Sequence, residues 1–414
     1  MHNSVYYIIL VIIVLDFIFE RYLEYLNSNS LSVKLPDELK GIYNEEQYAR
    51  SQKYEKAKSR FSLVTATLSF FVIILMFAFG GFGWLDIYLR QWTTNPIWLA
   101  LLFFGVIGLA SDILTLPFGW YSTFVIEERF GFNKTTVKTF IFDHIKSLLL
   151  AAVIGGGLLA LVVWIYEQTQ GMFWIYTLIV ITAFSLFMTM FYSTLVVPLF
   201  NKQKPLQDGE LRDAIQRFSE RAGFKLDNIF VIDGSKRSTK ANAYFTGFGA
   251  KKRIVLYDTL MGEMENEEIV AVLAHEIGHY KKKHIVSGLL LSLLNTAVML
   301  YIFSLVVGRP EPALALGADV ASFHVGLVAF GILYAPLSFL IGMGMNVFSR
   351  KNEYQADSFA ASYGLAEALG NSLKKLSVKN LSNLTPHKAY VFFHYSHPPL
   401  LARLKNLKAN NPDK

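Results

Sequence analysis

Seven long apolar stretches constrain the fold of this chain more than any other feature of its sequence. Each is long enough to cross the roughly 30 Å hydrocarbon core of a bilayer as a helix. They lie at Val5–Leu26, Ser62–Gly83, Ile97–Val125, Ile145–Tyr166, Met172–Phe200, Ile285–Val307 and Ser322–Phe348. We therefore expect an α-helical integral membrane protein with seven transmembrane helices. The lipid bilayer is thus one of its expected partners.

The composition supports a membrane protein. The chain is 53% hydrophobic and 17% charged, with a mean hydropathy of +0.36, which is too apolar for a soluble domain of 414 residues. Its net charge of +7 is explained by loop charges that orient the helices, so we expect no nucleic-acid partner. The first stretch lacks a basic start and a small-residue cleavage site, so we predict a retained helix and not a signal peptide.

The basic residues predict the orientation of the chain. Of its 39 Lys and Arg residues, only Arg90 and Arg309 fall in gaps on the side opposite to all the others. Because cytoplasmic loops carry the excess of positive charge, the N-terminus should lie outside or in a lumen. The two largest polar segments, Asn201–His284 and Ser349–Lys414, should then share the cytoplasmic side.

These assignments divide the chain into four parts. Residues 1–200 hold the first five predicted spans, and residues 285–348 hold the sixth and seventh. Residues 201–284 and residues 349–414 are the two large polar segments, which we expect to form one cytoplasmic domain. Within the cytoplasmic segment we expect a helix and then a small sheet, at Asp208–Gly223, Asn228–Ile232, Ala241–Phe248 and Arg253–Asp258.

The stretch Val270–His284, VAVLAHEIGHYKKKH, places side chains for a specific chemistry. An apolar run with acidic residues before it and lysines after it predicts a helix, so His275 and His279 should lie one turn apart on one face. Two such imidazoles can bind a zinc ion, and Glu276 can take the proton of a water molecule held there. A helix whose histidines make ordinary hydrogen bonds is the alternative.

A third metal ligand must come from elsewhere in the chain. With 0 Cys, the site must use His and carboxylates, which favours one Zn²⁺ per chain over iron or manganese. Glu353 follows the seventh span and should lie at the same membrane surface as the two histidines. Asp357, one turn further on, can orient a ligating imidazole. Both carboxylates are otherwise typical of a solvated helix surface.

Candidate substrate contacts lie on either side of these ligands. If the strand at Asn242–Thr246, which includes Ala243 and Tyr244, is at the edge of the sheet, it can pair with an extended substrate backbone; an ordinary hairpin strand is the alternative. His397, followed by two prolines, can donate to a developing oxyanion or simply occupy a turn. Arg403 either meets a substrate carboxylate or pairs with a structural acid.

Polar residues inside the predicted spans should face a protein interior or a watery cavity, because they are costly against lipid. The clearest examples are Asp16, Asp112, His324, Asn295 and Asn346.

Taken together, these motifs resemble the type I CAAX prenyl proteases, a family of integral-membrane zinc peptidases. The matching segments are His275–His279, Asn352–Asp357, Ser396–Leu400 with Arg403, Lys240–Gly247 and, in the membrane part, Leu116–Asn133. HExxH alone is shared by many peptidases, whereas the joint set is specific to this family.

The resemblance implies a barrel-like ring of seven helices around a water-filled chamber, capped by a zincin-like α+β metallopeptidase domain. It implies removal of the last three residues of prenylated CAAX proteins or peptides. By matching position, His275, His279 and Glu353 would bind zinc, Glu276 would be the general base, and His397 and Asn242 would contact the substrate backbone. Asp357 takes the place of an acid that orients a ligand.

The compact chain resembles prokaryotic members of the family, so we expect it in a bacterial inner membrane, or in the endoplasmic reticulum membrane if the source is eukaryotic. We also expect a monomer. Prokaryotes generally lack protein prenylation, so the substrate can be an unprenylated peptide or protein. Two alternatives to the prenyl-protease function remain at this stage. One is a quality-control zinc protease for membrane proteins, and the other is a transporter or scaffold with structural zinc.

Overall fold

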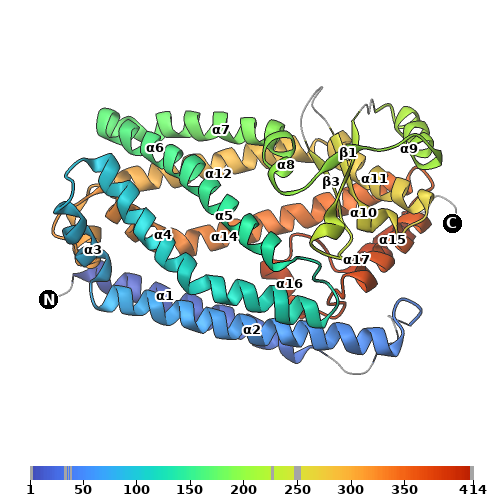
Figure 1. The fold of residues 1–414 in the computed structure, drawn as a ribbon, viewed down its shortest axis with the longest axis horizontal. Coiled ribbons are helices and arrows are strands. Elements are labelled where there is room, and N and C mark those ends of the chain that lie inside the picture. Colours follow the sequence, from blue (N-terminus) through green and yellow to red (C-terminus); the bar gives the residue numbers. More distant parts are fainter. Residues whose placement is uncertain are drawn as a thin grey trace.

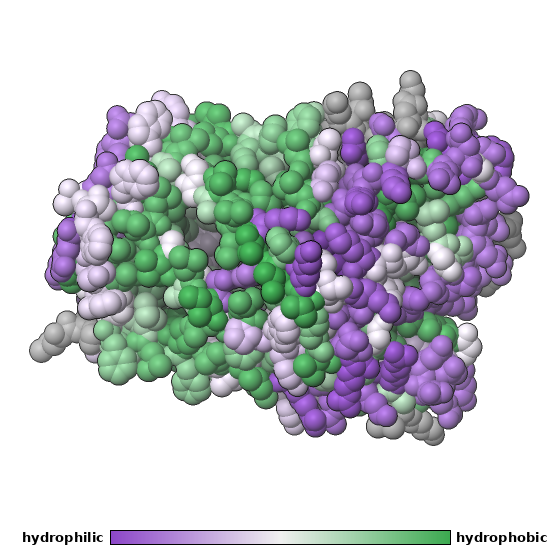
Figure 2. Space-filling view, viewed as in Figure 1, coloured by the Kyte–Doolittle hydropathy of each residue, from purple (hydrophilic) through white to green (hydrophobic). Residues whose placement is uncertain are grey.

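The structure is a computed structural model that describes residues 3–31, 35, 37, 40–224, 228–246 and 253–410. Long helices run along its longest axis, and a mixed α/β part lies at one end (Figure 1). The surface changes from hydrophobic over the long helices to hydrophilic over the α/β part (Figure 2). This division separates a membrane-embedded part from a polar domain.

The elements follow the chain in this order. The helices are α1 (Ser4–Asn29), α2 (Glu45–Ala78), α3 (Gly81–Arg90), α4 (Pro96–Tyr121), α5 (Val137–Leu150), α6 (Gly156–Thr169), α7 (Phe173–Leu195), α8 (Val197–Phe200), α9 (Glu210–Arg221), α10 (Asp258–Met261), α11 (Asn266–Lys281), α12 (His284–Val306), α13 (Pro310–Ala315), α14 (Phe323–Ala361), α15 (Ala366–Lys379), α16 (Lys388–His394) and α17 (Leu400–Ala409). Two π-helical segments, η2 (Ser122–Glu127) and η3 (Ala151–Gly155), continue α4 and α5. Short 3₁₀ turns are η4 (Gln170–Met172) and η5 (Gly234–Lys236).

Five helical stretches of the described residues are long and apolar enough to cross a membrane. They are Glu45–Ala78, Pro96–Glu127, Val137–Phe200, His284–Val306 and Phe323–Ala361. Helix α1 is not among them, because Asp16, Glu20 and Arg21 interrupt its apolar sequence. The chain is therefore a multi-pass helical membrane protein.

Several helices begin or end outside the predicted spans. Helix α2 begins at Glu45 and α5 at Val137, before the spans predicted from Ser62 and Ile145. The stretch predicted at Ser62–Gly83 ends at Ala78, because Gly80 adopts a left-handed conformation (φ 62°) and the chain turns into α3. The predicted boundary at residue 348 falls inside α14, which continues to Ala361. The last turns of this helix therefore belong to the peptidase part.

Most of the intramembrane polar residues contact protein groups. Asp86 accepts a buried hydrogen bond from His324 at 2.7 Å, and Asp112 pairs with His144 of α5 at 3.0 Å. Asn346 donates to a backbone carbonyl at 2.7 Å, and Asn295 accepts from a tyrosine hydroxyl at 3.4 Å. These contacts confirm that the side chains are turned toward protein rather than toward lipid.

The polar domain is built on a four-stranded sheet in the order β1-β2-β4-β3. The strands are β1 (Gln203–Pro205), β2 (Ile229–Ile232), β3 (Ala243–Thr246) and β4 (Arg253–Tyr257). Strands β2 and β4 are parallel, and the two outer pairs are antiparallel. Three strands were predicted; β1 was missed because three residues that include a proline give no recognisable strand pattern.

Helix α11 is the centre of this domain. It packs with α9, α14 and α15 over a core that includes Ile215, Leu256, Leu273 and Leu369. Its N-terminus carries a reciprocal capping box between Glu265 and Glu268. The helix that was predicted to carry the metal ligands is thus held on several sides.

Candidate metal centre and active site

Two helices, α11 and α14, bring the predicted metal ligands together. Gly278, inside the HExxH sequence of α11, lies against α14, and a Cβ built on it would be 3.1 Å from the Cα of Ala356. A larger side chain at this position would push the helices apart. The close approach places His275 and His279 opposite Glu353.

The three ligand atoms lie within 4.8 Å of one another. The Nε2 atoms of His275 and His279 are 3.1 Å apart, and they lie 3.5 and 3.3 Å from the Glu353 carboxylate oxygens. Ligand atoms about 2.1 Å from a tetrahedral metal ion are about 3.4 Å apart. The residues therefore fit a single metal ion, with one coordination position left for water or substrate.

Asp357 and Arg403 lie behind this group. Asp357, whose side chain has no exposed surface, contacts the Nδ1 of His275 at 2.9 Å. Arg403 binds the same carboxylate through two hydrogen bonds, at 2.6 and 2.9 Å, and approaches Glu353 at 3.5 Å. In this structure Arg403 pairs with structural acids, one of the two roles that its sequence context left open.

A second chain of contacts leads away from His279. Its Nδ1 lies 3.1 Å from the Nδ1 of His284, and the Nε2 of His284 donates to the side-chain oxygen of Gln355 at 2.8 Å. Because the Nε2–H of a neutral His284 donates to Gln355, its Nδ1 can accept a hydrogen bond from the Nδ1–H of His279. That arrangement leaves the Nε2 of His279 free as a ligand. The role of His284 was not predicted from the sequence, although it is the third histidine of HEIGHYKKKH.

Hydrogen bonding changes the proton affinity of His275. Burial of the imidazole disfavours its charged form, but hydrogen bonds to Asp357 and Glu353 outweigh burial and raise the pKa of His275 to about 9. In the metal-free protein this histidine is therefore protonated at neutral pH. A metal ion must displace that proton, because it binds the neutral imidazole.

A cavity of about 240 Å³ lies beside the ligands. The predicted site residues that line it are Asn242, Ala243, His275, Glu276, Glu353, His397 and Arg403. A larger polar cavity of about 580 Å³ shares His397 and Arg403 with it. Glu276 thus lines the same cavity as two of the candidate ligands, His275 and Glu353.

Strand β3 is an outer strand of the sheet in the described residues, and its first residue, Ala243, lines this cavity. Tyr257 of β4 donates its N–H to the carbonyl of Asn242 at 3.1 Å. Because antiparallel bonds alternate, the backbone groups of Ala243 and Phe245 point away from β4. The Ala243 N–H already binds the Asn242 side chain at 2.9 Å. The two carbonyls and the Phe245 N–H face outward.

Two predicted substrate contacts are placed differently from the rest. The side chain of Tyr244 points to the other face of the sheet, where its ring packs near that of Tyr257 with centroids 6.4 Å apart. His397 lies at the rim of the site: its Nε2 is 3.7 Å from Glu353, and 63% of its side chain is exposed. The residues Gly247 and Phe248 of the predicted strand lie outside the described residues.

Contacts from the membrane helices hold the segment that precedes β3. Lys240 donates to Glu127, at the end of η2, at 2.7 Å and to the hydroxyl of Tyr54, on α2, at 2.8 Å. The loop after η2 binds the same segment through its backbone: the N–H of Thr239 donates to the carbonyl of Phe132 at 3.1 Å. The open edge is therefore positioned by the membrane part as well as by the sheet.

Two family descriptions match adjoining parts of this chain. Residues 24–202 match "CAAX prenyl protease N-terminal, five membrane helices", and residues 205–411 match "Peptidase family M48". This chain belongs to the CAAX prenyl protease family of M48 peptidases. The M48 match covers α11, α14 and the tail, and so includes all three ligand positions.

The alignments of this family member with named CAAX prenyl proteases cover almost the whole chain. CAAX prenyl protease 1 of Saccharomyces cerevisiae is 35% identical, with 95% of this chain and 92% of the relative aligned. Its Arabidopsis thaliana homolog is 37% identical, with 94% of each aligned, and its human homolog is 32% identical, with 90% and 88% aligned.

The fold is similar to a solved structure. The crystal structure of S. mikatae Ste24p superposes with a TM-score of 0.93 at 35% identity, covering 98% of this chain and 100% of that one. The M48 family implies a metal cofactor, which the arrangement of His275, His279 and Glu353 accommodates. The protein is thus a membrane metallopeptidase of the CAAX prenyl protease type, and this assignment disfavours the transporter or scaffold hypothesis.

Proposed function

We propose that this protein is a zinc endopeptidase that cleaves peptides near their C-terminus, with prenylated CAAX proteins or peptides as its substrate class. One observation carries the proposal: the Nε2 atoms of His275 and His279 lie 3.1 Å apart, and 3.5 and 3.3 Å from the two carboxylate oxygens of Glu353, beside a cavity lined by Glu276 and by Ala243 at the start of β3. The substrate class follows from the relatives, which are named CAAX prenyl proteases.

His275, His279 and Glu353 would hold the zinc ion, which these separations and nitrogen and carboxylate donors suit. When bound, zinc supplies a Lewis acid that acidifies water and polarises a carbonyl group. Asp357 keeps the Nε2 of His275 toward the ion by accepting from its Nδ1–H. His284 would likewise accept a hydrogen bond from the Nδ1–H of His279 and keep the Nε2 of that ring toward the ion.

Glu276 would be the general base and then the general acid. Its carboxylate faces the cavity from the same helix turn as His275, so it can take a proton from the attacking water and return it to the leaving amine. His397, at the rim, would donate to the oxygen of the scissile carbonyl as negative charge develops there. Its exposed side chain has room to approach a bound peptide.

The substrate would lie extended along β3. The outward carbonyls of Ala243 and Phe245 and the Phe245 N–H can pair with alternate residues of a peptide, giving main-chain recognition without strict sequence preference. Asn242, exposed at the start of the strand, would contact the substrate backbone through its side chain. Arg403 would hold Asp357. It also lines both cavities, so it would be available to a substrate carboxylate as well.

In the membrane we propose seven spans around a water-filled chamber. The five apolar stretches become seven if Val137–Phe200 crosses twice, with its turn at Gln170–Met172, and if α1 also crosses. The charge asymmetry of the loops supports an external N-terminus and a cytoplasmic peptidase domain formed by residues 201–284 and 349–414. We propose that the protein acts as a monomer.

The source of the protein bears on its natural substrate. A prokaryotic origin and a bacterial inner membrane stay predictions, and the relatives described above come from yeast, a plant and human. If the host does not prenylate proteins, the same chemistry would act on unprenylated peptides or on damaged membrane proteins.

The test uses detergent-purified wild type and Glu276→Gln. Zinc content is measured by elemental analysis, and cleavage is measured on a farnesylated C-terminal peptide and on its unprenylated form. We expect one zinc per chain in both proteins and a loss of about 10²–10⁴ in kcat for the variant. Zinc binding without cleavage of either peptide by the wild type would contradict the proposal.

A further inference from the structure

A groove of about 530 Å³ lies between α2 and the continuous helix formed by α4 and η2. Most of its wall is apolar, with Phe61 and Val64 on one side and Phe118, Tyr121 and Val125 on the other. The rings of Phe61 and Tyr121 stack across it, with centroids 5.5 Å apart. Two cations, Arg60 and Arg129, complete the lining.

The position of the arginines along the helices places them at the membrane surface. Arg60 immediately precedes the apolar part of α2, and Arg129 follows the apolar part of α4 and η2. From this level, the wall from Val125 back to Pro117 reaches about 12 Å along the helix toward the membrane centre. The groove therefore begins at headgroup depth and continues into the hydrocarbon.

The groove lies on the side of α4 that is turned away from α5. Asp112 precedes Tyr121 by nine residues, which at about 100° per residue is half a turn around α4. Asp112 pairs with His144 of α5 at 3.0 Å, so that side of α4 faces protein. The groove lies on the opposite side, against α2, where Val64, Tyr121 and Val125 are exposed.

Neither arginine has a carboxylate within ion-pair distance among the residues that the structure describes. Both side chains are exposed. The guanidinium of Arg129 lies 5.9 Å from the centroid of the Phe130 ring. A guanidinium matches phosphate oxygens through paired hydrogen bonds. Two unneutralised guanidinium groups at headgroup depth therefore fit an anion that also carries an apolar chain.

The backbone itself keeps the groove open. Pro117 removes one helical hydrogen bond from α4, and the helix then widens into the π-helical turn Ser122–Glu127. Such irregular turns are frequent at functional sites. The space is thus built into the main chain and does not depend on the rotamer of one side chain.

We propose that this groove binds one anionic phospholipid of the surrounding bilayer. Its phosphate would lie between Arg60 and Arg129, and one acyl chain would follow Phe61, Val64 and Tyr121 into the membrane. Binding at this site does not require the peptidase reaction, so the proposal is independent of the proposed function.

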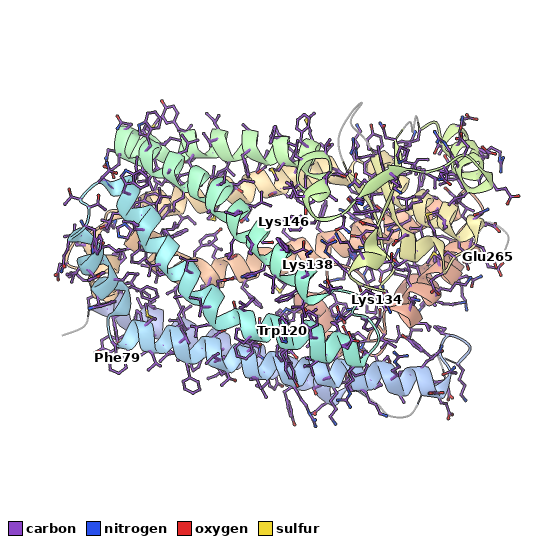
Figure 3. All side chains as sticks on the ribbon, viewed as in Figure 1. Phe79, Trp120, Lys134, Lys138, Lys146 and Glu265 are labelled. Carbon is purple, nitrogen blue, oxygen red and sulfur yellow. The ribbon has the colours of Figure 1, made fainter. Side chains whose placement is uncertain are left out.

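The test is native mass spectrometry of the full-length protein with equal amounts of phosphatidylglycerol and phosphatidylcholine that carry identical acyl chains. We expect the wild type to retain one phosphatidylglycerol in preference to phosphatidylcholine. Arg60→Gln combined with Arg129→Gln should weaken that binding about tenfold or more, as expected for losing charge-assisted hydrogen bonds. The matched control is Lys138→Gln, which removes a cation of α5 at the same surface but outside the groove (Figure 3).

A second variant tests the apolar part separately. Val64→Trp keeps both arginines and fills the groove from a position that is 57% exposed, so it should fold and still lose the lipid. Equal binding of the two lipids by the wild type, or full retention of phosphatidylglycerol by either groove variant, would overturn the proposal. Displacement of the lipid by a farnesylated peptide would instead assign the groove to the prenyl group, and would also overturn it.

Discussion

Arg403 holds Asp357 with two hydrogen bonds, 2.6 Å from Nη2 to Oδ1 and 2.9 Å from Nε to Oδ2. The same Oδ1 lies 2.9 Å from the Nδ1 of His275, so a residue of the C-terminal helix α17 positions a candidate metal ligand on α11 through an acid on α14. Three helices from distant parts of the sequence are connected by this one carboxylate.

Replacing Arg403 by Met should destabilise the protein strongly. The Asp357 side chain has no exposed surface, and breaking a buried ion pair by removing one partner costs about 3–5 kcal/mol. Thermal unfolding, followed together with zinc content, checks this. The double variant Arg403→Met with Asp357→Leu should recover much of the stability, because the unpaired charge is then gone. A single variant as stable as wild type would show that the pair carries little energy.

The stability of the metal-free protein should fall as the pH rises from about 6.5 to about 9. The folded protein raises the pKa of His275 to about 9, above its ordinary value of 6.5, so its protonated form stabilises the fold. That contribution is complete below 6.5 and is lost as the pH passes through 9; by linkage it amounts to about 3 kcal/mol. Unfolding of chelator-treated protein across this range measures it. His275→Gln should lack this window, and a flat profile for wild type would contradict the assignment.

Removing the support of His279 should speed up metal loss. His284→Phe and Gln355→Leu each interrupt the contacts at 3.1 and 2.8 Å that orient the ring of His279. Such supporting contacts contribute about 10–100-fold to metal affinity. The measurement is the rate of zinc transfer to a chelator. Gln355→Glu, which keeps a hydrogen-bond acceptor at the same place, is the matched control and should stay close to wild type.

Backbone recognition along β3 predicts an alternating pattern in the substrate. A series of peptides, each N-methylated at one position, should show a raised KM only where the lost N–H faces the carbonyls of Ala243 or Phe245. Loss of one hydrogen bond should raise KM up to about tenfold. Neighbouring positions, whose N–H points away from the strand, serve as controls. A uniform effect along the peptide would exclude strand pairing.

Much of the candidate site was predictable because it depends on local sequence. The spacing of His275 and His279 sets their common helix face, and the acidic and basic flanks of the segment favour the helix that was found. Glu353 was predictable from the order of the apolar stretches, which returns the chain to the same membrane surface. Helix α9 and three of the four strands also follow from their local patterns.

Other features depend on contacts between distant residues, which local patterns do not specify. β3 is at the edge only because β4 lies between it and β2. Whether Arg403 would meet a substrate or Asp357 was open until α14 and α17 packed together, and His284 acquired its role only from Gln355 on α14. The sequence by itself determined the membrane class and the helix that carries the two candidate histidine ligands, through hydrophobic length and helical period. The tertiary structure decided which partners those residues met, because packing across the fold sets those distances.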